Sequence, residues 1–236
     1  MNRRPVLLVV EHEEEAPAAL LAEVAAAAGV RLRVARPYAG EPLPDGLDGA
    51  DGLVVLGGEM GVGDAASWPH LHTAMALIRH AAARAAPVLG VCLGAQLAAE
   101  ALGGRAFPGP AGMEVGWVPV ELTPQGRDDP VVGALLDGDA RAPATVFQWH
   151  EDTYEPPPGA SLLAHGDRYR QQAFRLGSVV GVQFHPEVDA ATLTGWYAKA
   201  PTPPPYPRAQ ALAGVASWTP PARRLLDAFC VQLLRR

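Results

Sequence analysis

A cysteine stands at an abrupt change of pattern in "PVLGVCLGAQLAAEALGG", residues 87–104. An apolar, strand-like run ends on Cys92, Gly90 and Gly94 flank it, and a helix-forming run follows. Glycine allows a tight turn and a close approach of neighbouring backbone, and G-x-C-x-G is the cysteine form of the nucleophile elbow. The N–H groups and dipole at the start of the following helix favour a thiolate. The pattern therefore predicts that Cys92 is a nucleophile.

The second cysteine has a different setting. Cys230 lies in "LLDAFCVQLL", on an apolar helical face with Leu226, Phe229 and Leu233, and this is typical of a buried structural cysteine. Two cysteines so far apart in sequence form no disulfide framework, so we expect a reducing, cytoplasmic location.

A thiolate nucleophile needs a base to carry protons and a further group to orient that base. His185 in "VVGVQFHPEV" directly follows an apolar run, and Pro186 stiffens the turn after it. Glu187, two residues on, can accept a hydrogen bond from one ring nitrogen while the other faces Cys92. We therefore predict that His185 and Glu187 serve Cys92.

The other histidines considered carry weaker signals. His12 lies in an acidic run, and His165 ends a strand-like segment. His70, His72 and His80 fall on or beside a helix, and we interpret the pair His70-x-His72 as surface residues because no third metal ligand lies nearby. The sequence predicts neither a metal site nor a cofactor. The glycine-rich "LGGEMGVGD" lacks the Gly-Lys-Ser/Thr of a phosphate-binding loop.

Composition excludes several classes of protein. The chain has 236 residues with 49% hydrophobic content, which is enough for one sizeable core. Its net charge is −6 without a basic block, which disfavours nucleic-acid binding. No apolar run reaches the length of a membrane span. The N-terminus begins basic and then apolar, but acidic residues follow position 10 at once, so a buried strand is expected there, not a signal peptide.

The first half of the chain alternates short apolar strands with helices. Strands are expected at residues 5–10, 31–35, 53–56 and 87–91, and helices at 16–28, 70–86 and 93–102. This alternation predicts an α/β fold, a three-layer sandwich whose mostly parallel central sheet is covered by helices on both faces. Ligands gather at the carboxyl ends of the strands in such sheets, where Cys92 and His185 are both expected.

The second half is rich in strand-like segments. "MEVGWVPVEL", "ATVFQW", "ASLLAH" and "SVVGVQF" extend the same sheet with mixed or antiparallel strands, so we assign a single domain to residues 1–236. A helix is expected at residues 189–200 and a C-terminal helix at 220–235. Between them, the proline-rich residues 201–207 predict a stiff, polyproline-like loop. A lid or a partner-docking segment is the alternative interpretation of that loop.

Taken together, "GVCLGAQ" and "QFHPEV" resemble the class I glutamine amidotransferases, which use a Cys–His–Glu triad. "VVLGGEMGVGD", "MEVGW" and "WHED" fall in order between them, so the chain is similar to the stand-alone, GMP-synthetase-like branch. The resemblance runs from the first strand to about Val188. It implies a flavodoxin-like fold.

The resemblance implies a role for each matching residue. Cys92 would be the nucleophile, His185 the acid/base and Glu187 its orienting partner. The backbone N–H groups of Gly58 and Leu93 would form the oxyanion hole. Gln96 would contact the bound glutamine, and the backbone around Trp149, His150 and Glu151 would hold its α-amino and carboxylate ends.

One residue departs from the family's pattern. The family usually has Gly-Gly-Pro after the third strand, and this chain has "GGE". Glu59 puts a carboxylate beside the place where an anion must develop, and removal of one oxyanion donor already costs about 3 kcal/mol. We expect the side chain of Glu59 to face solvent or to pair with an arginine.

The resemblance implies an enzyme that cleaves the γ-amide of L-glutamine through a glutamyl thioester on Cys92 and releases glutamate and ammonia. Residues 189–236 are too short for a second catalytic domain, so a separate synthetase would accept the ammonia, or the amide is simply hydrolysed. Two alternatives stay open. One is a hydrolase of γ-glutamyl peptides or polyamine conjugates with the same triad, and the other is a catalytically weak regulatory or binding protein, for which Glu59 is the only support.

Overall fold

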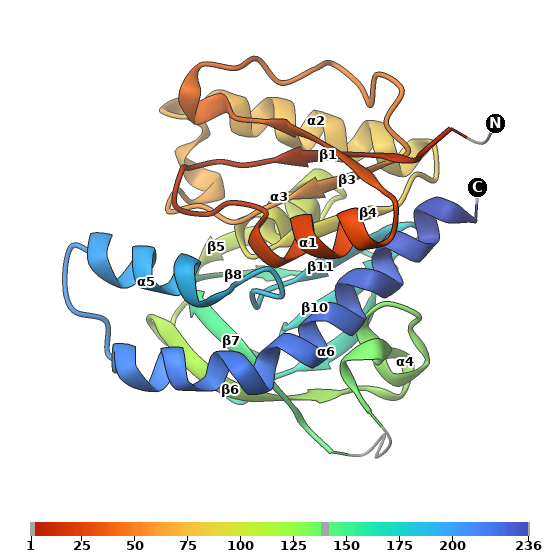
Figure 1. Ribbon diagram of the computed structural model, residues 1–236. Coiled ribbons are helices and arrows are strands. Elements are labelled where there is room, and N and C mark those ends of the chain that lie inside the picture. The colour runs from red at the N-terminus through yellow and green to blue at the C-terminus, as the bar shows by residue number, and fades with distance from the viewer. Residues whose placement is uncertain (1–2, 138–141, 236) are drawn as a thin grey trace.

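A nine-stranded sheet forms the centre of the protein, whose computed structural model describes residues 3–137 and 142–235 (Figure 1). Five neighbouring strands are parallel: β2 (Arg31–Ala35), β1 (Val6–Val10), β3 (Gly52–Val55), β4 (Val88–Val91) and β11 (Val179–Val182). The sheet continues with antiparallel neighbours: β10 (Ala173–Leu176), β9 (Ser161–His165), β6 (Glu114–Leu122) and β7 (Ala144–His150). The β-rich second half of the chain thus extends the parallel half in one sheet.

Helices cover both faces of this sheet. One side carries α1 (Ala19–Ala27), α5 (Ala190–Lys199) and α6 (Arg208–Leu234), and the other carries α2 (His70–Ala83) and α3 (Leu93–Ala101). A short α4 (Pro124–Asp128) and three 3-10 turns, at Pro37–Ala39, Val62–Ala66 and Val132–Leu135, lie in the connections. Among the described residues, the helices include none that is long and apolar enough to cross a membrane.

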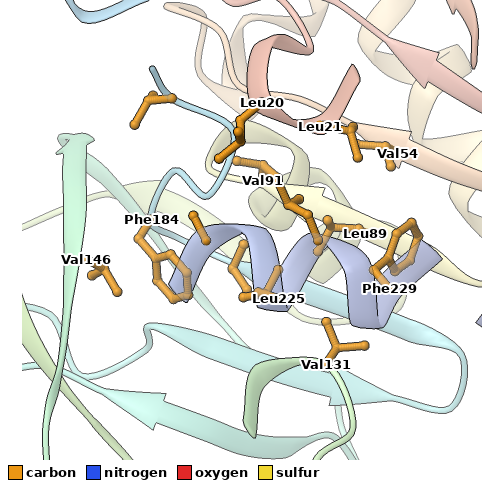
Figure 2. Close-up of a cluster of buried hydrophobic side chains, with 14 of the residues drawn as sticks. Leu20, Leu21, Val54, Leu89, Val91, Val131, Val146, Phe184, Leu225 and Phe229 are labelled. Carbon is orange, nitrogen blue, oxygen red and sulfur yellow. The ribbon is translucent and has the colours of Figure 1, made fainter. Parts of the chain in front are cut away.

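Four of the parallel strands, β1, β3, β4 and β11, bury both of their faces. Leu7 and Val9 of β1 belong to the hydrophobic cluster that also holds α1 and α6, whereas Leu8 and Val10 belong to the cluster with α2 and α3. Figure 2 shows strand side chains of the first cluster, Leu89 and Val91 among them, directed at Phe229 and its neighbours on α6. A side-chain period of two with both faces apolar requires a three-layer fold, and the predicted α/β class is confirmed.

The C-terminal helix begins earlier than predicted. It was expected over residues 220–235, but α6 runs from Arg208 to Leu234 and contains Pro220 and Pro221. Proline usually opens a helix because it has no N–H to donate. Here the helix continues through both prolines, Thr219 donates its hydroxyl to the carbonyl of Val215 at 2.9 Å, and the buried Trp218 ties this part of α6 to the core. Residues 201–207 connect α5 and α6 without helix.

Three strands were not predicted. They are β10, already described, and the antiparallel pair β5 (Arg105–Pro108) and β8 (Asp152–Glu155), which forms a separate two-stranded sheet. β5 and β8 are four residues each, with the sequences RAFP and DTYE, and neither alternates apolar with polar side chains. The single domain predicted for residues 1–236 includes positions 1, 2, 138–141 and 236, which lie outside the described residues.

Two glycines let α3 start directly against the sheet. A Cβ added to Gly94 would lie 1.9 Å from the carbonyl oxygen of Val55, and one added to Gly90 would lie 2.4 Å from the carbonyl oxygen of Gly94. No real side-chain carbon approaches a backbone oxygen so closely. The first turn of α3 therefore packs on the ends of β3 and β4 only because both positions lack a side chain.

We expect Gly94→Ala to lower the free energy of unfolding by more than about 3 kcal/mol, because the new methyl group must push α3 away from Val55. The matched control is Gly195→Ala in α5, where nothing lies within 4 Å of an added Cβ and where alanine should stabilise the helix by up to about 1 kcal/mol. Urea unfolding measures both. A Gly94→Ala protein as stable as the wild type would contradict the close packing.

Candidate active site

Cys92 occupies the turn between β4 and α3 in a strained conformation. Its φ is 52° and its ψ is −110°, a positive φ that a residue with a side chain adopts at a cost of about 1–3 kcal/mol. The surrounding backbone holds it there: its N–H donates to the carbonyl of Val182 at 2.8 Å, and its carbonyl accepts from Ala95 and Gln96 at 2.9 and 3.1 Å. Such strain is typical of a nucleophile elbow.

His185 and Glu187 form a buried pair beside this turn. Nδ1 of His185 donates to Oε1 of Glu187 at 2.8 Å, and both side chains are at most 3% exposed. A Cβ added to Gly57 would lie 3.2 Å from Cε1 of His185 and 3.5 Å from Cβ of Cys92, so the imidazole and the cysteine lie against the same glycine. In the described part of the chain, Nε2 of His185 has no hydrogen-bond partner.

The charge state of His185 follows from its neighbours. Burial alone disfavours the imidazolium, but the charges of Glu187 and Cys92 and the hydrogen bond to Glu187 outweigh it and raise the pKa of His185 to about 10. The imidazolium is therefore the stable form near neutral pH. Cys230 differs, because burial in the first place and Asp227 in the second raise its pKa to about 12.

The predicted oxyanion residues lie close together. A Cβ added to Gly58 would lie 3.2 Å from Cδ2 of Leu93. Leu93 is the first residue of α3, and the N–H groups in the first turn of a helix have no partner within that helix. Glu59 is exposed, and its N–H donates to Oε2 of Glu13 at 3.2 Å. The carboxylate of Glu59 thus faces solvent, and within the described residues it forms no ion pair with an arginine.

The predicted substrate contacts surround the same turn. The thiol of Cys92 lies 3.8 Å from the carbonyl oxygen of Trp149, and the amide nitrogen of Gln96 donates to the carbonyl of Asp152 at 3.0 Å. His150 is buried and also bonds to Asp152, whereas the Glu151 carbonyl accepts from Gly109 at 3.0 Å. The Glu151 carbonyl therefore already has a hydrogen-bond donor within the protein.

Sequence reasoning missed a buried polar network at the end of β7. Nε2 of His150 lies 3.1 Å from Oε2 of Glu114, its partner across the strands. Gln172 donates to the same carboxylate oxygen at 3.3 Å and accepts from Gln148 at 2.6 Å. Since the carbonyl of Asp152 can only accept, Nδ1 of His150 carries a proton and Nε2 faces the carboxylate. This network fixes the β7 end next to Cys92.

A contact between two histidines was also missed. His12 is fully buried, and its Nδ1 lies 3.1 Å from Nε2 of His70, which is half-buried and not the surface residue expected. Burial in the first place, with His70 in the second, lowers the pKa of His12 to about 3. A signal was available, because His12 follows the end of β1 as His185 follows the end of β11. Among the described residues, no group of three or more His, Cys, Asp or Glu could hold a metal.

Comparison with known proteins identifies the family of this chain. A family model described as glutamine amidotransferase class-I matches residues 18–195. The glutamine amidotransferase-like protein YfeJ of Salmonella typhimurium is 31% identical over 190 residues, which are 79% of this chain and 77% of that protein. The chain belongs to the class I glutamine amidotransferases.

This class I glutamine amidotransferase is also similar to two solved structures and to a further relative. A glutamine amidotransferase from Thermotoga maritima superimposes with a TM-score of 0.85 at 25% identity over 100% of both chains. One from Methylobacillus flagellatus gives a TM-score of 0.83 at 26% identity, covering 99% of this chain and 95% of the other. The GMP synthase of Pyrobaculum aerophilum is 40% identical over 103 residues, which are 43% of this chain and only 18% of that protein.

The raised pKa of His185 is open to direct measurement. We expect NMR of the ¹⁵N-labelled imidazoles to show His185 protonated at pH 8, with a midpoint near 10, and Glu187→Gln to lower that midpoint because the carboxylate is lost. Since the folded pKa lies above the ordinary value, protonated His185 stabilises the fold fully below about pH 6.5 and this stability is lost as pH rises through about 10. A wild-type midpoint below 7 would contradict the ion pair.

Proposed function

We propose that this chain hydrolyses the γ-amide of L-glutamine through a thioester on Cys92. The observation that carries the proposal is the strained Cys92 beside the buried His185–Glu187 pair, whose two residues are joined at 2.8 Å. The match of the class I glutamine amidotransferase model over residues 18–195 supports it. The site offers what amide cleavage by a thiolate needs: a nucleophile, a proton carrier and a group that orients the carrier.

The first half of the reaction forms the thioester. The thiolate of Cys92 attacks the carbonyl carbon (Cδ) of the side-chain amide, and the amide oxygen becomes an oxyanion. The N–H groups of Gly58 and Leu93 stabilise that oxyanion, each such donor being worth about 3 kcal/mol. His185 then gives the proton on Nε2 to the amide nitrogen, the carbon–nitrogen bond breaks, and ammonia leaves.

The second half regenerates the thiolate. His185, now neutral, takes a proton from water, and the hydroxide attacks the thioester carbonyl. Collapse of this second tetrahedral adduct breaks the carbon–sulfur bond and releases the thiolate and the γ-carboxylic acid, which becomes glutamate by losing its proton to solvent or ammonia, while the proton taken from water stays on His185. Glu187 keeps its bond to Nδ1 throughout, so Nε2 is the only nitrogen that exchanges a proton.

Polar groups around the turn would hold the substrate. Gln96 lies one turn into α3, and the backbone from Trp149 to Glu151 passes the Cys92 thiol, with the Trp149 carbonyl 3.8 Å from it. We assign the α-amino and α-carboxylate groups of glutamine to this backbone. Because the Glu151 carbonyl is bonded to Gly109, the carbonyl of Trp149 is the stronger candidate for the amino group.

The ammonia would leave for a separate acceptor or for solvent. The GMP synthase of Halobacterium salinarum, a glutamine-hydrolysing enzyme by name, has one subunit that is 40% identical over 108 residues, which are 43% of this chain and 53% of that protein. By analogy with such a relative, we propose that a synthetase on another chain accepts the ammonia. Without such a synthetase, the protein would act as a glutaminase that releases ammonia into solution.

We expect wild-type protein to release glutamate from glutamine and Cys92→Ala to reduce the rate at least about 10³-fold, because the nucleophile is lost. Cys230→Ala is the matched control and should keep the rate within about twofold, as that thiol lies in the core away from the turn. Mass spectrometry of quenched wild-type protein should find a glutamyl adduct on Cys92. A wild type that releases no glutamate, alone or with cell extract, would contradict the proposal.

A substrate panel with the same two variants separates the two enzymatic alternatives. If γ-glutamyl peptides or polyamine conjugates are turned over far faster than glutamine, and Cys92→Ala abolishes both rates, the enzyme is a γ-glutamyl hydrolase that uses the same three residues.

The exposed position of Glu59 predicts a small effect of its charge. We expect Glu59→Gln to change kcat for glutamine hydrolysis by less than about threefold, because a carboxylate in water acts weakly on an oxyanion at some distance. A rise of tenfold or more in kcat would show instead that Glu59 opposes catalysis, as the catalytically weak alternative requires.

A further inference from the structure

The chain beyond the matched family segment reaches back to the candidate active site. The family model ends at residue 195, and the rest of α5, the loop 201–207 and α6 follow it. Two tryptophans of this C-terminal segment, Trp196 and Trp218, contact His185. Neither contact follows from the motifs that carry the resemblance.

Trp218 holds the backbone of His185. Its side chain is buried, at 2% exposure, and its indole N–H donates to the carbonyl of His185 at 3.2 Å. The N–H of His185 donates to the carbonyl of Phe147 at 3.0 Å. The backbone groups on both sides of the His185 Cα are thus fixed, one by β7 in the sheet and the other by α6 in the layer above it.

Trp196 packs against the imidazole itself. The two ring centroids are 4.7 Å apart with an interplanar angle of 73°. The indole is anchored at its own N–H, which donates to the carbonyl of Glu15 at 2.7 Å, and it also packs on Trp149 at 5.6 Å. Because Trp149 presents the carbonyl that faces the Cys92 thiol, one indole borders both sides of the site.

These contacts restrict how His185 can move. Glu187 fixes Nδ1, Trp218 fixes the backbone carbonyl, and Trp196 blocks rotation of the ring on one side. A displacement of about 1 Å at a catalytic group can lower a rate on the order of 10²-fold. Removal of one of these contacts should therefore lower the rate measurably.

We propose that Trp196 and Trp218 are positioning residues that hold the imidazole of His185 towards Cys92, and that the segment 196–235 thereby completes the active site. The inference rests on the proposed role of His185 as the proton carrier. It assigns to α5 and α6 a function in the reaction beyond their packing in the core.

The test compares the loss of two indole hydrogen bonds that each involve α6, one from Trp218 on the helix and one from Trp117 on β6. Trp218→Phe removes the N–H that bonds to His185 and keeps an aromatic ring. Trp117→Phe removes a bond of the same kind between β6 and α6, because the Trp117 indole donates to the carbonyl of Ala211 at 3.0 Å. Both variants lose one indole hydrogen bond to the backbone, but only the first touches His185.

We expect Trp218→Phe to lower kcat for glutamine hydrolysis about tenfold with KM within about twofold. It should also slow alkylation of Cys92 by iodoacetamide at pH 7, followed on the Cys92 peptide by mass spectrometry, because a displaced imidazolium stabilises the thiolate less. Trp117→Phe should leave kcat and the alkylation rate within about twofold of the wild-type values, while its Tm falls by about as much as that of Trp218→Phe. If kcat and the alkylation rate were the same in Trp218→Phe as in Trp117→Phe, the proposal would be overturned.

Two further outcomes are decisive. If Trp218→Phe does not fold, Trp196→Leu replaces it and should slow both reactions, and unchanged rates in that variant would overturn the proposal. If the wild type hydrolyses no glutamine but Trp218→Phe still slows alkylation of Cys92, the positioning role stands and the proposed substrate is wrong. Alkylation needs no substrate, so the two failures are distinguishable.

Discussion

The contact between the first turn of α3 and the carbonyl of Val55 constrains the whole candidate site. Gly94 allows this contact, since any Cβ there would overlap that oxygen at 1.9 Å. With α3 so close to β3, the chain must turn within a single residue after β4, and Cys92 takes the positive φ that results. The same approach brings Leu93 next to Gly58. The strained backbone of Cys92 and the closeness of Leu93 to Gly58 therefore follow from one steric requirement.

Two buried histidines at the carboxyl edge of the sheet have pKa values shifted in opposite directions. His12 and His185 each follow a buried strand, and burial disfavours the charged form of both. Burial and the neighbouring imidazole of His70 lower the pKa of His12 to about 3. His185 has Glu187 and the Cys92 thiolate, and its pKa rises to about 10. The position in the fold is shared, so the acidic partners decide which histidine can donate a proton near neutral pH.

Much of the fold and site could be predicted because the signals are local. Strands such as β1 and β4 are continuous apolar runs, and Cys92 and His185 each sit in a short motif directly after one. The contact between His12 and His70 spans 58 positions in sequence and depends on how the end of β1 meets the start of α2. β5 and β8 pair with each other, but each is only four residues long and neither alternates apolar with polar side chains. These features come from packing, which no local pattern encodes.

The largest error of sequence reasoning, the start of α6, has a cause that bears on the site. Two prolines mark a helix start by local rules, and the stretch before them contains Gly214, a weak helix former. Tertiary contacts override both preferences: the Trp117 indole occupies the space that a side chain at position 214 would need, and Trp218 bonds to His185. Natural sequences break local rules chiefly where function demands it. A helix that keeps prolines in its interior and places an indole on His185, the proton carrier that we propose, fits that expectation, which is why we assign α6 to the active site as well as to the core.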